Sequence, residues 1–117
     1  MITLTTFQWV DVCALGEVAV DRGVCAAIDG EQVAIFRVSG WSELFAISNI
    51  DPFSGVAVLA RGLVGESNGV PKVASPLYKQ TFDLRTGRCL EDPAVAVRTF
   101  AVRLRAGRVE VARSTSV

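Results

Sequence analysis

The stretch that decides the fold runs Ser75-Pro76-Leu77-Tyr78-Lys79-Gln80-Thr81-Phe82-Asp83-Leu84-Arg85-Thr86-Gly87. It opens with a proline-containing loop, and residues 80–84 then have the pattern of a short strand. The strand runs into Arg85-Thr86-Gly87, where a glycine suits a turn position of positive φ. The stretch therefore predicts a loop, a strand and a tight turn in direct succession.

Short strands and turn residues continue on both sides of this stretch. Alternation in residues 7–12 predicts a half-buried strand. Asp29-Gly30 predicts the tight turn of a hairpin between residues 24–28 and 32–38, since this pair tolerates positive φ angles. Residues 14–23 leave room for one helical turn, and residues 56–60 fit either a strand or a short buried turn. Further strands are expected at residues 41–47, 61–66, 70–74, 98–105 and 108–112.

Roughly eight or nine short strands with closely spaced turns predict an all-β protein, built as an antiparallel β-sandwich or barrel. The chain of 117 residues is long enough for one domain with a hydrophobic core. We expect a single domain over residues 1–117, with its core at about 7–112. A small loop-rich subdomain is expected at about residues 49–83, and residues 113–117 are expected to form a frayed polar tail.

The composition narrows the classes of partner. Twelve basic and twelve acidic residues cancel, which argues against nucleic acid as a partner. No apolar run approaches the roughly 18 residues that cross a bilayer, so no membrane partner is expected. The first residues lack the basic start and apolar segment of a signal peptide, and a cytoplasmic location is the default expectation.

The charges are unevenly distributed along the chain. Residues 1–55 carry seven acidic and two basic side chains, a formal charge of −5, whereas residues 56–117 carry ten basic and five acidic ones, a formal charge of +5. The favoured interpretation is that the two halves neutralise each other within one folded domain. The alternative is that the second half presents a basic face to an acidic protein partner.

The sequence contains no histidine. Catalysis by a Ser-His-Asp or Cys-His arrangement within this chain is therefore excluded. The three cysteines, Cys13, Cys25 and Cys89, are far apart and include no Cys-x-x-Cys pair, so they predict neither a disulfide framework nor a zinc site. Buried, reduced thiols are expected for most of them.

Two loops, residues 49–54 and 75–80, together resemble the metal-binding loops of the Rieske ferredoxin family. That family carries Cys-x-His in the first loop and Cys-x-x-His in the second, followed by a Phe-Asp-Leu strand and a Thr-Gly turn. Residues 82–87 match the strand and the turn. The four ligand positions are instead held by Asp51, Phe53, Ser75 and Tyr78. Because a Rieske cluster needs two thiolates and two imidazoles, the resemblance implies the fold without the cluster.

Three segments, residues 51–53, 59–65 and 75–84, are more specifically similar to the small subunits of assimilatory NADH-dependent nitrite reductases. This resemblance covers about residues 9–111. It implies an accessory subunit with no cofactor of its own. Its partner would be a large subunit that carries FAD, sirohaem and an iron–sulfur cluster and reduces nitrite to ammonium. A stand-alone cluster-free module that binds another oxidoreductase is the alternative.

The resemblance leaves two roles open for the loop side chains. The favoured interpretation is that at least one of Phe53 and Tyr78 packs into the space of the missing cluster. Docking of the loop tips on a partner is compatible with this, since one ring can pack while the other is presented. Asp51 is expected to cap its own loop by accepting backbone N–H bonds. The remaining candidates for partner binding are Arg61, Lys72, Lys79 and Gln80. The three cations could bind an anion such as nitrite, pair with carboxylates of a partner, or be ordinary solvated charges, and Gln80 could be an ordinary outward strand residue.

Overall fold

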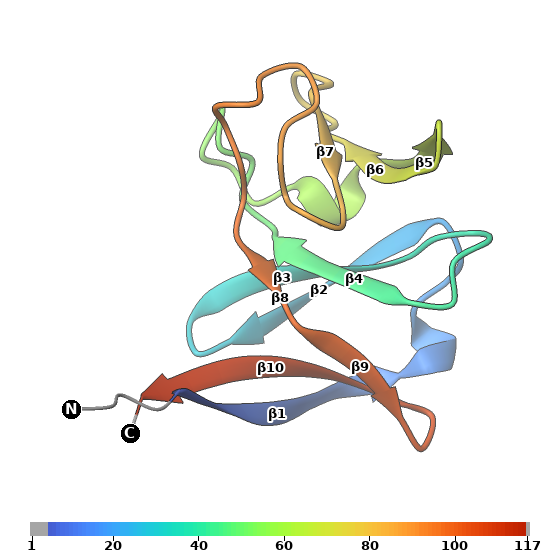
Figure 1. The fold of residues 1–117 in the computed structure, drawn as a ribbon, viewed down its shortest axis with the longest axis vertical. Helices are drawn as coiled ribbons and strands as arrows, with labels where there is room; N and C mark the ends of the chain where they lie inside the picture. Colours follow the sequence, from blue (N-terminus) through green and yellow to red (C-terminus); the bar gives the residue numbers. More distant parts are fainter. Residues whose placement is uncertain (1–4, 117) are drawn as a thin grey trace.

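The computed structural model describes residues 5–116, which form ten β-strands and two short 3₁₀ helices (Figure 1). The strands are β1 (Thr5–Ala14), β2 (Arg22–Ile28), β3 (Glu31–Arg37), β4 (Leu44–Ser48), β5 (Leu63–Ser67), β6 (Val70–Ala74), β7 (Thr81–Asp83), β8 (Thr99–Phe100), β9 (Val102–Arg105) and β10 (Arg108–Ser116). The 3₁₀ helices are η1 (Leu15–Glu17) and η2 (Leu59–Arg61). All ladders between these strands are antiparallel, which confirms the predicted all-β class.

The strands form three sheets, ordered β1-β10-β9, β2-β3-β4-β8 and β5-β6-β7. Figure 1 shows the four-stranded sheet in the middle, with β1 and β10 below it and the small sheet β5-β6-β7 above it. The described residues begin in β1 and end in β10, and both strands lie at the lower end. The small sheet comes from the segment expected to form a loop-rich subdomain, and the loops around it lie at the upper end.

Strand β3 is buried on both faces, because it separates two hydrophobic cores. Ala34 and Phe36 point into a core shared with the small sheet, which includes Phe82 and Leu84. Alternate residues, including Val33, belong to a second core shared with β10. A strand covered on both sides reads as a continuous apolar run, since neither set of alternating side chains meets water.

The predicted strand at residues 98–105 is divided in the structure. β8 pairs with β4 in the middle sheet, whereas β9 pairs with β10 in the lower one. The chain changes sheets at Ala101, whose carbonyl oxygen accepts a hydrogen bond from the Ala112 amide at 2.9 Å. Apolar and polar residues alternate along much of this segment in the sequence. Such alternation indicates a strand, but it does not specify which neighbouring strand the segment pairs with.

The expected frayed tail is wrong for residues 113–116, because β10 continues through Ser116 and pairs with β1 as far as Thr5. Residue 117 lies outside the described residues. The ambiguous residues 56–60 form no strand of a sheet. They contain one isolated bridge, at Ala57, and the beginning of η2. The single helical turn expected within residues 14–23 is confirmed as η1.

Three ion pairs join the acidic first half of the chain to its basic second half. Arg108 pairs with Asp11 at 2.8 Å and Arg113 with Asp29 at 2.6 Å, and Arg98 pairs with Glu31. The expected neutralisation between halves is thus confirmed for these residues. All six side chains are more than 40% exposed, so each pair contributes little to stability.

The three cysteines are free, and their burial differs from the expectation. Cys89 is buried, Cys13 is half-buried and Cys25 is exposed, so the expectation that most of the three thiols are buried is wrong. Cys25 lies on β2, an edge strand of its sheet. Within residues 5–116, no helix has the length and apolar character that a membrane span requires.

Candidate functional site

The two loops singled out in the sequence lie at the end of the molecule opposite β1 and β10 (Figure 1). The first loop (residues 49–54) follows β4, and the second loop (residues 75–80) connects β6 to β7. A side-chain hydrogen bond joins them, in which the Ser75 hydroxyl donates to Asp51 Oδ2 at 2.5 Å. Asp51 is 0% exposed and Ser75 is 1% exposed. This bond therefore lies in the interior, where a hydrogen bond is strong and an unpaired group is costly.

Asp51 also organises the first loop from within. Its Oδ1 accepts the backbone N–H of Phe53 at 2.8 Å, as predicted for a residue that caps its own loop. The backbone closes around the same residue, because the Gly55 N–H donates to the Asp51 carbonyl oxygen at 2.7 Å. The Asp51 N–H in turn donates to the Val56 carbonyl oxygen at 2.9 Å. The loop is thus held from both the side chain and the main chain.

The second loop is a closed turn. The Ser75 N–H donates to the Gln80 carbonyl oxygen at 2.8 Å, and the Lys79 N–H donates to the Ser75 carbonyl oxygen at 3.0 Å. Lys79 has a φ of +63°. The turn directs Leu77 and Tyr78 outward, with exposures of 46% and 61%.

The structure separates the roles left open for the two aromatic residues. Phe53 lies partly against the core, since its ring centroid is 6.4 Å from that of buried Phe82, but the side chain is still 39% exposed. Tyr78 faces solvent instead of the interior. Packing against the core therefore explains the placement of the Phe53 side chain in part, and it does not explain the placement of the Tyr78 side chain.

The four positions that the resemblance assigns to metal ligands do not fit a Rieske [2Fe–2S] cluster. Such a cluster takes two thiolates and two imidazoles, and the sequence has no histidine. Phe53 has no donor atom, and the oxygen atoms of Asp51 and Ser75 are hard donors already bonded to each other. Asp51 and Ser75 hold the two positions that are cysteines in the Rieske pattern. A hydrogen bond between these two side chains joins the loops.

The candidate cations do not form one group. Arg61 and Lys79 line the same groove, together with Arg22, whereas Lys72 lies half-buried on β6 and does not line it. Gln80 is half-buried as well. Its side-chain oxygen Oε1 is buried and accepts no hydrogen bond from any described residue. Arg22 was missed by sequence analysis because it is distant along the chain from both loops.

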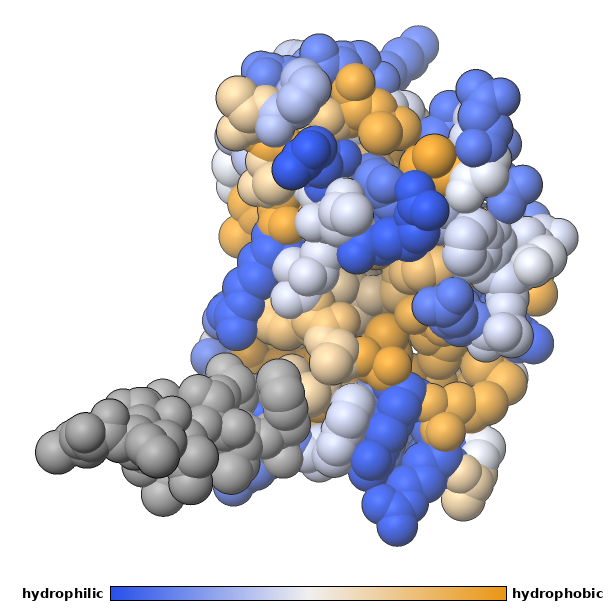
Figure 2. Space-filling model, in the orientation of Figure 1, coloured by the Kyte–Doolittle hydropathy of each residue, from blue (hydrophilic) through white to orange (hydrophobic). Residues whose placement is uncertain are grey.

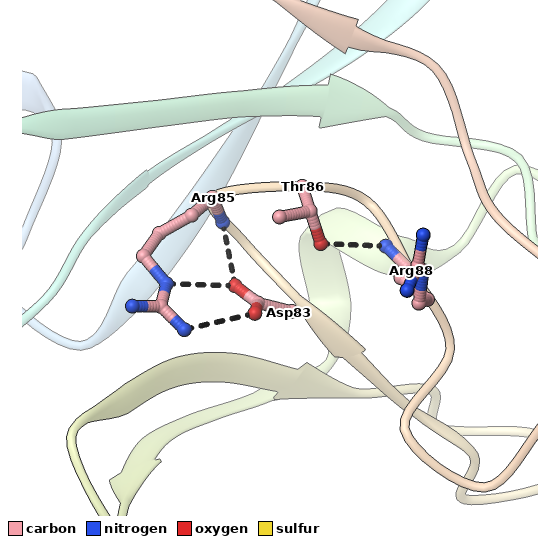
Figure 3. A network of polar contacts seen from close by, with 4 residues as sticks. All are labelled: Asp83, Arg85, Thr86 and Arg88. Carbon is pink, nitrogen blue, oxygen red and sulfur yellow. Dashed lines mark hydrogen bonds and ion pairs between the residues drawn. The ribbon is translucent and has the colours of Figure 1, made fainter. Parts of the chain in front are cut away.

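The Thr-Gly turn that follows the second loop is organised by Asp83 (Figure 3). Asp83 Oδ1 accepts the Arg85 backbone N–H at 2.9 Å, and the Arg85 guanidinium binds both carboxylate oxygens at 3.0–3.1 Å. Burial by itself raises the pKa of Asp83, but the hydrogen bonds and the charge of Arg85 outweigh it. The net result is a pKa below the ordinary value.

The lowered pKa predicts an acid-dependent contribution of Asp83 to stability. A carboxyl group whose pKa is lower in the folded state stabilises the fold above its unfolded pKa of about 3.9 and loses this effect as the pH falls through the folded value. Replacing Asp83 with Asn should therefore cost about 1 kcal/mol at neutral pH and progressively less below about pH 4. Urea unfolding at several pH values measures this difference. A loss of stability that is the same at every pH would contradict this assignment.

Sequence reasoning also missed Asn49, which is 4% exposed. Its Oδ1 accepts the Ala60 N–H at 2.7 Å, and its backbone carbonyl oxygen accepts the N–H groups of Val58 and Leu59. Asn49 thereby attaches the first loop to η2 and the groove beside it. The position of an Asn two residues before Asp-Pro-x-Ser-Gly could have drawn attention to it, since Asn commonly bonds to nearby backbone in turns.

Comparison with known proteins supports this geometry. Residues 8–112 match the family described as the Rieske-like [2Fe-2S] domain. The nitrite reductase (NADH) small subunit of Escherichia coli strain K12 is 46% identical over 104 residues, which cover 89% of this chain and 96% of the relative. The NMR structure of the E. coli protein NirD superposes with a TM-score of 0.85 at 44% identity, covering 92% of this chain and 98% of that chain.

A third relative places a similar domain in a longer protein. The nitrite reductase [NAD(P)H] large subunit of Klebsiella oxytoca is 38% identical over 108 residues, which are 92% of this chain and 11% of that protein. The predicted Rieske-like fold and the predicted resemblance are both confirmed by these matches. The chain therefore belongs to the Rieske-like [2Fe-2S] domain family and, within it, to the nitrite reductase (NADH) small subunits.

Proposed function

We propose that the chain is an accessory subunit without catalytic activity of its own, which binds the large subunit of an NAD(P)H-dependent nitrite reductase through its two loops. The large subunit holds the FAD, sirohaem and iron–sulfur cluster and reduces nitrite to ammonium. The chain holds no redox group, and the complex works in the cytoplasm. The donor atoms at the former ligand positions support the part of the proposal that concerns cofactors, because they suit no [2Fe–2S] cluster.

The observation that carries the proposal is the apolar surface of two rigid loops. Phe53, Leu77 and Tyr78 are 39–61% exposed, although the loops that present them are joined by a buried hydrogen bond. Figure 2 shows apolar atoms at the surface of the upper part of the molecule, among hydrophilic ones. Exposed aromatic side chains on a preorganised surface are typical anchors of protein interfaces, because little entropy is lost when they bind.

The relative from Klebsiella oxytoca supports the choice of partner. In that protein a segment similar to this chain is covalently part of a polypeptide named as a large subunit. Fusion keeps two parts at a high effective concentration. Where the same domain is a separate chain, a binding surface has to hold the two proteins together instead.

Binding to the purified large subunit, with its cofactors in place, tests the proposal. The combined Leu77→Ala and Tyr78→Ala variant should bind about 10- to 100-fold more weakly than the unmodified chain, because anchor residues commonly contribute more than 1 kcal/mol each. Its melting temperature should be nearly unchanged, because both side chains are exposed. Phe53→Ala should lower both affinity and melting temperature, since Phe53 also packs on Phe82.

Leu104→Ala provides a matched control. Leu104 is 50% exposed on β9, in the sheet that lies away from the loops, and its replacement should leave the affinity unchanged. A chain that does not co-purify with the large subunit at modest salt would contradict the proposal. So would stoichiometric iron, or reduction of nitrite, in the purified chain alone.

A further inference from the structure

A groove of about 820 Å³ lies beside the second loop. Its walls are formed by the start of β2, by η2, by β5 and by the second loop. Its apolar lining includes Leu63, which is 80% exposed on β5, an edge strand of the small sheet. Three cationic side chains line the same groove: Arg22, Arg61 and Lys79. We call this feature the basic groove.

The charge of the basic groove is not balanced within the described part of the chain. Within residues 5–116, five other arginines form ion pairs with acidic side chains, whereas Arg22, Arg61 and Lys79 form none. The single acidic residue that lines the groove is Asp21, and its Oδ1 accepts the Ser39 backbone N–H at 2.9 Å. Three cations from segments far apart in the sequence thus face one partly occupied carboxylate. This arrangement favours a negatively charged occupant.

The groove is preformed because its walls meet through glycines. A Cβ atom at Gly23 would lie 2.6 Å from the Ala60 carbonyl oxygen, and one at Gly62 would lie 2.4 Å from the Ala74 carbonyl oxygen. The backbones of β2, η2 and β6 therefore approach more closely than side chains would allow. A cleft with such walls keeps its shape when empty, which lowers the entropy lost on binding.

Lys79 is placed at the groove at a conformational cost. Its φ of +63° belongs to the left-handed region, which glycine adopts freely and other residues adopt at a cost of roughly 1–2 kcal/mol. A glycine would therefore suit the backbone of this turn better. An unfavourable backbone conformation at a lysine points to a function of its side chain.

We propose that the basic groove holds an acidic, partly apolar polypeptide segment of the large subunit. This inference rests on the proposed function and adds a second contact to the loop surface, with which the groove is continuous through the second loop. A segment that alternates carboxylate and apolar side chains matches the cations and the apolar lining together. A small anion such as nitrite would fill only a minor part of an open groove of this size.

Charge reversal tests the inference in the complex with the cofactor-loaded large subunit. Arg61→Glu combined with Lys79→Glu should weaken binding about 10- to 100-fold at low salt and progressively less as salt is added, since screening removes the attraction. Arg88→Glu combined with Arg105→Glu changes the net charge equally at exposed positions outside the groove and should have little effect. Equal affinities for both double variants would overturn the inference.

Lys79→Gly separates binding from folding. The variant should keep or raise the melting temperature, because glycine relieves the positive φ, and should bind the large subunit about 3- to 10-fold more weakly. Unchanged affinity would overturn the inference, whereas a loss of stability would show that the side chain has a structural role and would also count against it.

Carbodiimide cross-linking identifies the contact directly. The chain has two lysines, Lys72 and Lys79, so peptide mapping can assign a bond to a carboxylate of the large subunit. A cross-link at Lys79 to an acidic segment is expected, and a cross-link at Lys72 alone would overturn the inference.

Displacement of the large subunit by nitrite at constant ionic strength would assign the groove to the free anion instead. If groove variants bind normally while loop variants do not, the inference fails and the proposed function stands; if the unmodified chain does not bind, both fail.

Discussion

Gly87→Ala should lower the free energy of unfolding by about 3–5 kcal/mol, among the largest effects expected for a single methyl group. Gly87 has a φ of +79°, and a Cβ atom there would lie 2.1 Å from the Val97 carbonyl oxygen. The backbone cannot move away freely, because the Gly87 N–H donates to the Asp83 carbonyl oxygen and its own carbonyl oxygen accepts the Val97 N–H, at 2.7 and 2.8 Å. Both the conformation and the contact therefore oppose a side chain.

Gly30→Ala separates these two causes. Gly30 has nearly the same φ, +80°, but a Cβ atom there would have no neighbour within 4 Å. Its replacement should cost only about 1–2 kcal/mol, the price of the left-handed conformation alone. Thermal unfolding should show a melting temperature lowered by more than about 10 °C for Gly87→Ala and clearly less for Gly30→Ala. Equal losses would show that the approach of Val97 has no energetic consequence.

Asp51→Ala should destabilise the protein by about 3 kcal/mol. The substitution removes the acceptor for the Ser75 hydroxyl and the acceptor for the Phe53 N–H, and a buried polar group without a partner costs about 1–3 kcal/mol. Both loops should loosen together, because the bond between Asp51 and Ser75 joins them. Chemical unfolding measures the loss of stability, and faster amide hydrogen exchange in both loops reports the loss of the connection.

A double-mutant cycle with Ser75→Ala isolates the bond between the loops. The two single substitutions should not add, and the coupling energy should exceed about 1 kcal/mol, as is usual for residues in direct contact. Asp51→Asn serves as the conservative variant, because its side-chain oxygen can still accept the Phe53 N–H. Full additivity of Asp51→Ala and Ser75→Ala would contradict the role assigned to this hydrogen bond.

The predictions for Gly87 and Asp51 concern neighbouring parts of the same region, namely the two loops and the turn that follows them. The second loop is attached to the first by Ser75, and the strand that follows it ends in the turn that Gly87 closes. The hydrogen bond between Ser75 and Asp51 therefore fixes the position of the two loops relative to each other. For an accessory subunit this means that Tyr78 and Leu77 can be presented on a rigid support, as the proposed docking surface requires.

Much of the fold could be predicted because turns and alternation are local properties. Asp29-Gly30 and Gly87 adopt the positive φ angles expected of them. The hairpin between β2 and β3 has the expected turn. The division of residues 98–105 between two sheets could not be predicted, since one alternating pattern serves equally well beside either neighbour.

The candidate site was predictable in part for the same reason. The residue types at positions 51, 53, 75 and 78 already exclude the donor set of a Rieske cluster, because this depends on the inventory of atoms alone. The capping role of Asp51 is also local, since its acceptor bond spans two residues. The presence of Arg22 in the same groove as Arg61 and Lys79 was missed, because these residues are distant along the chain.

Strands, turns and the chemistry of the loop residues thus follow from the amino-acid sequence, because each depends on near neighbours or on side-chain composition. Only the tertiary structure decides that Ser75 meets Asp51, that Gly87 lies against Val97 and that Tyr78 faces solvent. The reason is that these contacts join segments distant along the chain, and they form only when the packing of two cores brings the three sheets together.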